Sequence, residues 1–134
     1  MIYDTNLIIR YVRNQTMLPI RVVIPIVVAG ELEALALKND WGYQKVKFLQ
    51  HLIDSYPVAD LNREVTRVYA EIDAYSQGKS KQMPLPAGIT ARNMGKNDLW
   101  IAAIALYLDM ELHTADGDFD HLVHNGLKLI KHNA

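Results

Sequence analysis

The chain has 134 residues, a length typical of a single folded domain, and its formal net charge is −1. It contains no cysteine, so disulfides, thiolate zinc sites and cysteine nucleophiles are excluded, and a reducing cytoplasm is the compartment we expect. Half of the residues are hydrophobic and 22% are charged, which is ordinary for a folded protein and lacks the basic excess of many duplex-DNA binders.

The first half of the chain alternates short apolar segments with helical patterns. We expect a strand ending at Ile2–Tyr3, a helix over Asn6–Arg13, a strand over Arg21–Ile26, and helices over Val27–Leu37 and Gly42–Ser55. Pro25 should mark the end of the second strand, since proline cannot donate to a sheet. Residues 1–10 lack a signal-peptide pattern, and the longest apolar stretch, Val22–Ala29, is too short to span a membrane.

The second half begins with a brief strand and ends with another. The expected elements are a strand over Pro57–Leu61, a helix capped by Asn62, a loop over Gln77–Gly95, a helix over Lys96–Leu108, a strand over Glu111–Thr114, a short helix over Asp118–Asn125 ended by Gly126, and a strand over Leu127–Ile130. The helix after Asn62 places four apolar residues on one face: Val65, Val68, Tyr69 and Ile72. Two prolines and three glycines predict the loop.

Strands that alternate with helices predict one domain over residues 1–134, with a mainly parallel sheet between two helical layers, a three-layer α/β/α fold. Ligands of such folds bind outside the carboxyl ends of the strands. Asp4, Asp116 and Asp118 follow strands and should meet at that end, and Glu31 follows the second strand by way of its helix. Asp98 opens the alanine-rich helix, and its place depends on the loop before it.

Carboxylates that gather at one point repel each other unless protons or cations neutralise them. Oxygen ligands without histidine or cysteine suit Mg²⁺ or Mn²⁺, which can promote cleavage of a phosphodiester. A structural interpretation stands beside this one, because Asp4, Asp98 and Asp118 could each simply cap a helix. Asp116 could form a turn with the glycine after it, and Glu31 could face solvent.

Four sequence blocks carry a family resemblance. They are Ile2-Tyr3-Asp4-Thr5-Asn6, Val28-Ala29-Gly30-Glu31-Leu32, Asn97-Asp98-Leu99-Trp100-Ile101-Ala102-Ala103 and Leu112-His113-Thr114-Ala115-Asp116-Gly117-Asp118-Phe119. Their order and content resemble the PIN-domain ribonucleases across nearly the whole chain, and the short length resembles the VapC-like toxins of bacterial toxin–antitoxin pairs. Each block alone is weak, and the four together are specific.

The resemblance implies a function and a set of roles. Asp4, Glu31, Asp98 and Asp116 match the family's metal-binding and catalytic acids, and Asp118 matches an auxiliary fifth acid. Three polar residues match positions that support the acids: Thr5, Asn6 and Thr114. The implied reaction is endonucleolytic cleavage of single-stranded RNA with Mg²⁺ or Mn²⁺. The implied partners are a second copy of the chain, in a homodimer, and a cognate antitoxin protein that covers the acidic groove.

Several alternatives stay open. Lys79, Lys81, Arg92 and Lys96, in or beside the loop, could hold substrate phosphates or be merely solvated. The apolar face of Val46, Leu49, Leu52 and Ile53 could serve a dimer, although a protein core more often occupies such a face. His121 and His124 have a spacing that could bind zinc, but no third ligand is near in sequence. Glu33 should point away from Glu31.

Two other classes of protein remain. A phosphoacceptor receiver domain also gathers carboxylates around Mg²⁺, but it needs paired acids after the first strand and a lysine after a late strand. Only Asp4 follows the first strand, and we expect no lysine at the last one. A non-catalytic PIN-type scaffold that binds RNA or a partner would typically lack one or more of the acids, whereas none of the four is missing here.

Overall fold

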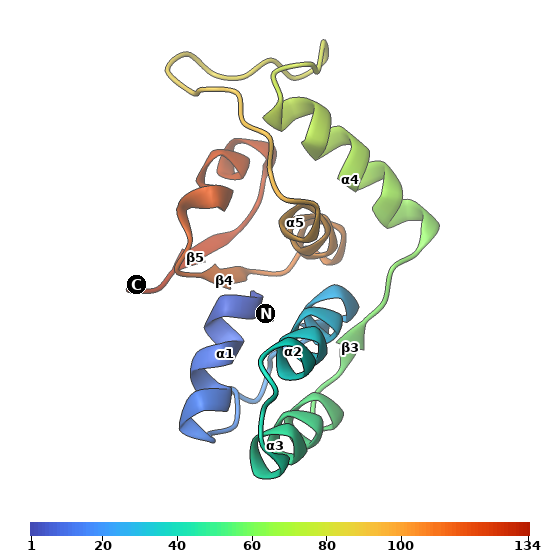
Figure 1. The fold of residues 1–134 in the computed structure, drawn as a ribbon. Helices are drawn as coiled ribbons and strands as arrows, with labels where there is room; N and C mark the ends of the chain where they lie inside the picture. Colours follow the sequence, from blue (N-terminus) through green and yellow to red (C-terminus); the bar gives the residue numbers. More distant parts are fainter.

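The computed structural model describes residues 1–134, and strands and helices alternate along them (Figure 1). The first half contains β1 (Ile2–Tyr3), α1 (Thr5–Asn14), β2 (Ile24–Pro25), α2 (Ile26–Lys38) and α3 (Tyr43–Asp54). The second half contains β3 (Val58–Ala59), α4 (Arg63–Ser76), α5 (Lys96–Leu108), β4 (Leu112–Thr114), the 3₁₀ helix η1 (Gly117–Asn125) and β5 (Leu129–Lys131).

All strand pairs are parallel. β1 pairs with β4, β4 with β5, and β2 with β3. A parallel bridge between Ile2 and Val23 joins the two groups, so the strands lie in the order β3, β2, β1, β4, β5. Because β1 and β4 are neighbours that run in the same direction, the residues that follow them emerge side by side at one end of the sheet.

Helices cover both faces of these strands. In Figure 1, α1, α2 and α3 lie on one side of β4 and β5, and α4, α5 and η1 lie on the other. The first three helices contact one another, and α4 packs against both α5 and η1. This arrangement confirms the expected three-layer α/β/α fold with a parallel sheet.

The buried hydrophobic residues form one cluster that runs from β1 through α5 to η1. Ile2, Leu112 and Phe119 are completely inaccessible to solvent within it. The apolar face of α3 belongs to the same cluster, since Leu49 and Leu52 are buried against the rest of the core. That face therefore contributes to the core.

The strands differ most from the sequence prediction. Arg21–Ile26 was expected as one strand, but β2 contains only Ile24 and Pro25. The prediction was too long because Val22 closes a turn by donating to the carbonyl of Pro19, and because Pro25 occupies the N-cap of α2. The last strand lies later than expected, since the amide of Leu127 still bonds back to Leu122 of η1.

Helix ends agree better, because local side chains determine them. Asn62 caps α4 by accepting a hydrogen bond from the amide of Val65 at 3.0 Å, as expected. The helix over Lys96–Leu108 has the predicted bounds. Gly126 ends the predicted short helix with a φ of 93°, a conformation that favours glycine. That helix is a 3₁₀ helix and not an α-helix.

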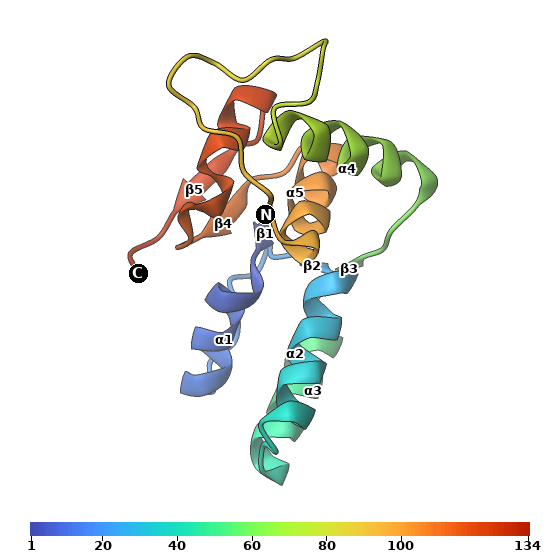
Figure 2. The same cartoon turned by 45° about the horizontal axis from the view of Figure 1, so that its top comes forward.

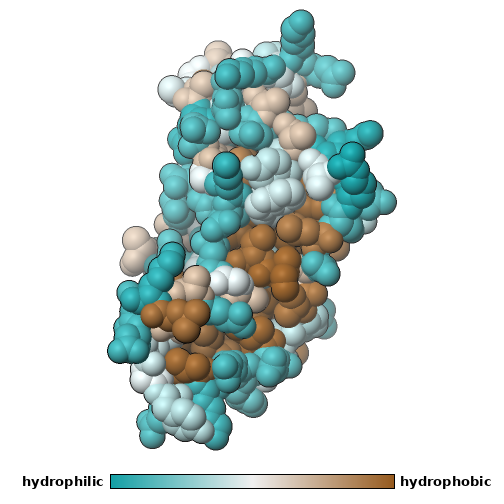
Figure 3. All heavy atoms as spheres, turned by 45° about the vertical axis from the view of Figure 1, so that its right-hand side comes forward, coloured by the Kyte–Doolittle hydropathy of each residue, from teal (hydrophilic) through white to brown (hydrophobic).

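One side of the surface has an apolar area. In Figure 3, which turns the α4 and β3 side of the molecule forward, this area is the brown patch near the centre. Around the β2–β3 pair, Ile26 and Val58 are 41% exposed and Leu61 is 36% exposed.

None of the helices has the length and apolar character that crossing a membrane requires.

Candidate metal centre and active site

Asp4 stands at the junction of β1 and α1. Its Oδ1 accepts a hydrogen bond from the amide of Leu7 at 2.9 Å, so the carboxylate caps α1. Its own amide donates to the carbonyl of His113, which continues the β1–β4 ladder. The side chain is only 4% exposed. The cap expected from the sequence is thus present, and the second carboxylate oxygen remains available to other groups.

Thr114, at the end of β4, joins Asp4 to the acidic turn that follows it. The fully buried Thr114 hydroxyl donates to Oδ2 of Asp4 and accepts from the amide of Asp116 at 2.9 Å. Oδ1 of Asp116 in turn accepts from the amide of Asp118 at 3.0 Å. A single threonine therefore sets where the acids after β1 and β4 lie relative to each other.

Three carboxylates meet beside this threonine. Asp98, Asp116 and Asp118 each offer an oxygen atom, and these atoms lie within 4.8 Å of one another. Asp98 comes from the first turn of α5, and the other two come from the turn after β4. Figure 2 shows the chain descending from the residue 77–95 loop into the start of α5, near the end of β1. The loop therefore delivers Asp98 to the acids that β4 positions.

Glu31 approaches from α2. Its Oε1 accepts a hydrogen bond from the hydroxyl of Thr5 at 2.7 Å, and its charge acts on Asp98. Thr5 is itself buried, at 8% exposure. Glu33 is exposed and lines a different pocket beside Trp41, so it points away from Glu31 as expected. Asn6 is exposed and makes no hydrogen bond to any of the acids.

The charges of the cluster act on one another. The pKa of Asp98 is raised from its usual value of 3.8 to about 6. Burial is the largest cause, and the negative charges of four nearby acids add to it: Asp116, Asp118, Glu31 and Asp4. Burial also raises the pKa of Asp4, while the hydrogen bonds from Thr114 and Leu7 oppose the rise. The shift means that burial and the neighbouring acids disfavour the ionised form of Asp98.

A divalent cation fits this set of donors. The site offers three converging carboxylate oxygens, all of them hard ligands. Two further acids, whose charges act on Asp98, make it strongly negative. A cation bound there would offset the burial and the negative charges that raise the pKa of Asp98. His121 is buried and its Nε2 hydrogen-bonds to Ser76 at 2.8 Å, and neither His121 nor His124 belongs to the group of three ligands that converges.

Lys131 was missed in the sequence. We expected no lysine at the last strand, but Lys131 ends β5, and its Nζ bonds to the carbonyl of Asp116 at 2.7 Å and to Asp120 at 2.9 Å. It therefore holds the backbone of the acidic turn and does not reach the carboxylates that converge. Its place one residue beyond the predicted strand was the signal that could have found it.

Arg92 is the one cation in the loop that reaches the cluster. Its Nη1 lies 4.0 Å from Oδ1 of Asp118 and donates to the carbonyl of Gly117 at 3.5 Å. The side chains of Lys79, Lys81 and Lys96 are exposed and form no hydrogen bond or ion pair. The loop therefore contributes one defined positive charge to the rim of the site.

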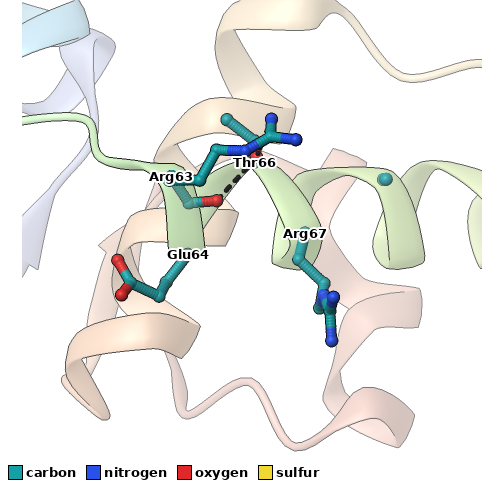
Figure 4. Close-up of a pocket in the computed structure, with 5 residues that line it drawn as sticks. Arg63, Glu64, Thr66 and Arg67 are labelled. Atoms are coloured by element: carbon teal, nitrogen blue, oxygen red, sulfur yellow. Dashed lines mark hydrogen bonds between the residues drawn. The ribbon is translucent and has the colours of Figure 1, made fainter.

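A separate pocket, with a volume of about 620 Å³, lies at the start of α4, away from the acidic cluster. Its lining includes Arg63, Glu64, Thr66 and Arg67 (Figure 4). Figure 4 shows Arg63 and Arg67 pointing away from each other, while the hydroxyl of Thr66 bonds to the carbonyl of Arg63. Because the polar groups do not converge, this pocket has the chemistry of an ordinary solvated surface.

Comparisons with known proteins bear on the fold that holds these acids. One family description, the PIN domain, matches residues 1–125. In the crystal structure of VapBC2 from Rickettsia felis, bound to a DNA fragment from its promoter, a chain matches with a TM-score of 0.76 and 20% identity over 98% of both chains. VapBC-1 from nontypeable Haemophilus influenzae gives 0.70 and 26% over 98% of both.

A third solved structure is VapBC-5 from Mycobacterium tuberculosis, a member of a family of toxin–antitoxin systems. It matches with a TM-score of 0.66 and 23% identity over 99% of this chain and 97% of that chain. No curated protein matches the sequence.

Proposed function

The chain belongs to the PIN-domain family, and from this premise we propose that it is a metal-dependent endoribonuclease that cleaves single-stranded RNA. PIN domains are generally nucleases. The observation that carries the proposal is the convergence of Asp98, Asp116 and Asp118, whose oxygen atoms lie within 4.8 Å of one another. The formal net charge of −1 accords with a site that takes its positive charge from a bound cation.

In this proposal Asp98, Asp116 and Asp118 hold Mg²⁺ or Mn²⁺, and Asp4 and Glu31 complete the negative site around it. Bound there, the cation supplies Lewis acidity, which makes water a stronger nucleophile and offsets charge on the phosphate. Asp98 must lose its proton before it can bind a cation, and its pKa of about 6 allows this at neutral pH.

The supporting residues act through the acids. Thr114 holds Asp4 and Asp116 together, and Thr5 orients Glu31 by donating to its Oε1. Since both hydroxyls bond to carboxylate oxygens, they limit the directions that those carboxylates can take. We assign Asn6 no such contact, and its supporting role stays a prediction.

The test is cleavage of 5′-labelled single-stranded RNA by the purified chain, with Mn²⁺, with Mg²⁺ and with EDTA. Asp98→Asn should abolish cleavage. Glu31→Gln should reduce it strongly, while Glu33→Gln, an exposed acid on the same helix, should leave it unchanged. Metal-dependent cleavage that survives Asp98→Asn would contradict the assigned site. RNA binding without cleavage by the wild type would replace the nuclease with the non-catalytic scaffold.

We also propose that the chain is the toxin of a toxin–antitoxin pair in the cytoplasm, that it forms a homodimer, and that an antitoxin covers the acidic site. The likeness to VapBC complexes supports this. Expression of the chain alone should stop growth, and co-expression of the protein encoded beside it should restore growth. Light scattering should give twice the chain mass. Unimpaired growth would remove the toxin role and leave a solitary nuclease.

A further inference from the structure

The long loop before α5 is closed by the last residue of α4. The hydroxyl of Ser76 donates to the carbonyl of Arg92 at 3.0 Å, and the amide of Arg92 donates to the carbonyl of Ser76 at 2.8 Å. Gln77 adds a side-chain bond to Asn93 at 3.3 Å. The backbone of Arg92 is thereby fixed, although the residues between the two contact points run over the surface.

A buried histidine supports this closure. His121 is 3% exposed and Ser76 is fully buried, and the His121 Nε2 lies 2.8 Å from the Ser76 hydroxyl. Because that hydroxyl already donates to Arg92, the Nε2 of His121 is the donor in its hydrogen bond to Ser76. Its Nδ1 is buried without a partner. The hydrogen bonds thus run from the buried His121 through Ser76 to the backbone of Arg92.

The fixed backbone directs the Arg92 side chain to the rim of the acidic cluster. Only Nη1 has contacts, at 3.5 Å from the carbonyl of Gly117 and 4.0 Å from Asp118, so the other guanidinium donors are unused. The side chain is 42% exposed. A pocket of about 370 Å³ lies along the same stretch, with Thr90, Arg92, Asn93 and Asp118 among its lining residues.

We propose that Arg92 binds a backbone phosphate of the RNA beside the scissile position, and that Ser76 and His121 are the positioning residues that hold it there. This inference rests on the proposed nuclease function. The acids alone would repel an RNA chain, and Arg92 is the only residue whose cation pairs with one of them. A guanidinium fork matches a phosphate in charge and geometry, and the hydroxyl and amide groups of the pocket suit a polar strand.

The test compares Arg92→Gln with Arg67→Gln, a control that removes an exposed arginine from α4. In steady-state cleavage of a single-stranded RNA, Arg92→Gln should raise KM about tenfold and leave kcat within about twofold. The slope of log affinity against log salt should fall by about 0.7, the contribution of one phosphate on a single strand. Arg92→Lys should restore the salt slope and only part of KM.

Three results would overturn the inference. The first is a KM and salt slope in Arg92→Gln equal to those of Arg67→Gln. The second is a lower kcat with a higher Mn²⁺ requirement and an unchanged KM, which would make Arg92 a partner of the metal site. The third concerns RNA binding without cleavage, measured by fluorescence anisotropy with Ca²⁺ as the only divalent cation. Equal RNA affinities of wild type and Arg92→Gln would reject the contact. Weaker binding by Arg92→Gln would support it even if the wild type cleaves no RNA and the nuclease proposal fails.

Discussion

Asp98 reports most directly on the electrostatics of the site. Its pKa of about 6, against a usual 3.8, arises from burial first and from four neighbouring acids second. An acid with a raised pKa binds its proton more tightly in the folded state than in the unfolded chain. Asp98 therefore contributes to the free energy of unfolding at low pH, and this contribution is lost as the pH rises from about 4 to about 6.

Asp98→Asn should remove that dependence in protein freed of metal by EDTA. At pH 4 the variant and the wild type should have similar free energies of unfolding. At pH 7 the variant should be more stable, by on the order of 1–2 kcal/mol, because solvent screens the partly exposed carboxyl and reduces the effect of its pKa shift. Urea unfolding at pH 4, 5, 6 and 7 measures this difference. A difference that stays constant across the range would show that folding does not raise the pKa of Asp98.

Thr114→Val should damage both stability and activity. The change keeps the side-chain shape but removes the hydroxyl that donates to Asp4 and accepts from the amide of Asp116. Loss of buried partners should lower the free energy of unfolding by about 1–3 kcal/mol, and cleavage should fall because Asp116 is released. Thr66→Val on the surface of α4 is the matched control. Wild-type cleavage in Thr114→Val would show that the acids hold their places without it.

At the level of elements, α5 and the loop before it connect the core to the chemistry. α5 buries Ile101, Ala102 and Ile104, and it carries Asp98 in its first turn. The loop has no regular structure, so its course depends on a few anchors, of which Ser76 at the end of α4 is the most buried. A substitution of Ser76 should therefore alter the position of Arg92 at the rim of the site.

Ser76→Ala tests the anchor. It leaves the Nε2–H of His121 and the carbonyl of Arg92 without a partner, so the free energy of unfolding should fall by about 1–3 kcal/mol. KM for RNA should rise while kcat changes less, because Asp98 and its neighbours are untouched. Chemical denaturation and steady-state kinetics provide both numbers. Ser55→Ala, at an exposed serine, should change neither, and equal behaviour of the two variants would contradict the role of the anchor.

At the scale of the whole molecule, the acidic site couples metal binding to stability. A cation that binds only the folded chain should raise Tm, by about 5–10 °C at a hundredfold excess over its Kd. Because Asp98 must release a proton first, the increase with Mn²⁺ should be smaller at pH 5 than at pH 7. Differential scanning fluorimetry measures this effect. Asp116→Asn should abolish the increase, and a Tm that Mn²⁺ leaves unchanged in the wild type would speak against a cation site.

Much of the architecture was predictable because local patterns determine it. The bounds of α5, the Asn62 cap and the Gly126 stop each depend on residues within a few positions, and the structure confirms them. The strands were less predictable, since Val22 has strand propensity, but a turn from Pro19 and the cap at Pro25 left β2 shorter. Strand length depends on pairing with a distant segment, and propensity alone does not contain that information.

By itself, the sequence determined that Asp4, Asp116 and Asp118 follow strands and that Glu31 lies in the helix after one, so that these acids are candidates for one site. Asp98 joined them only through the resemblance to PIN domains. Only the tertiary structure decided how they meet. Thr114 reaches Asp4 across 110 residues, His121 reaches Ser76 across 45, and Lys131 holds the turn at Asp116 across 15. These contacts, and the raised pKa of Asp98, follow from strand register and from which side chains exclude water, which depend on the folded chain as a whole.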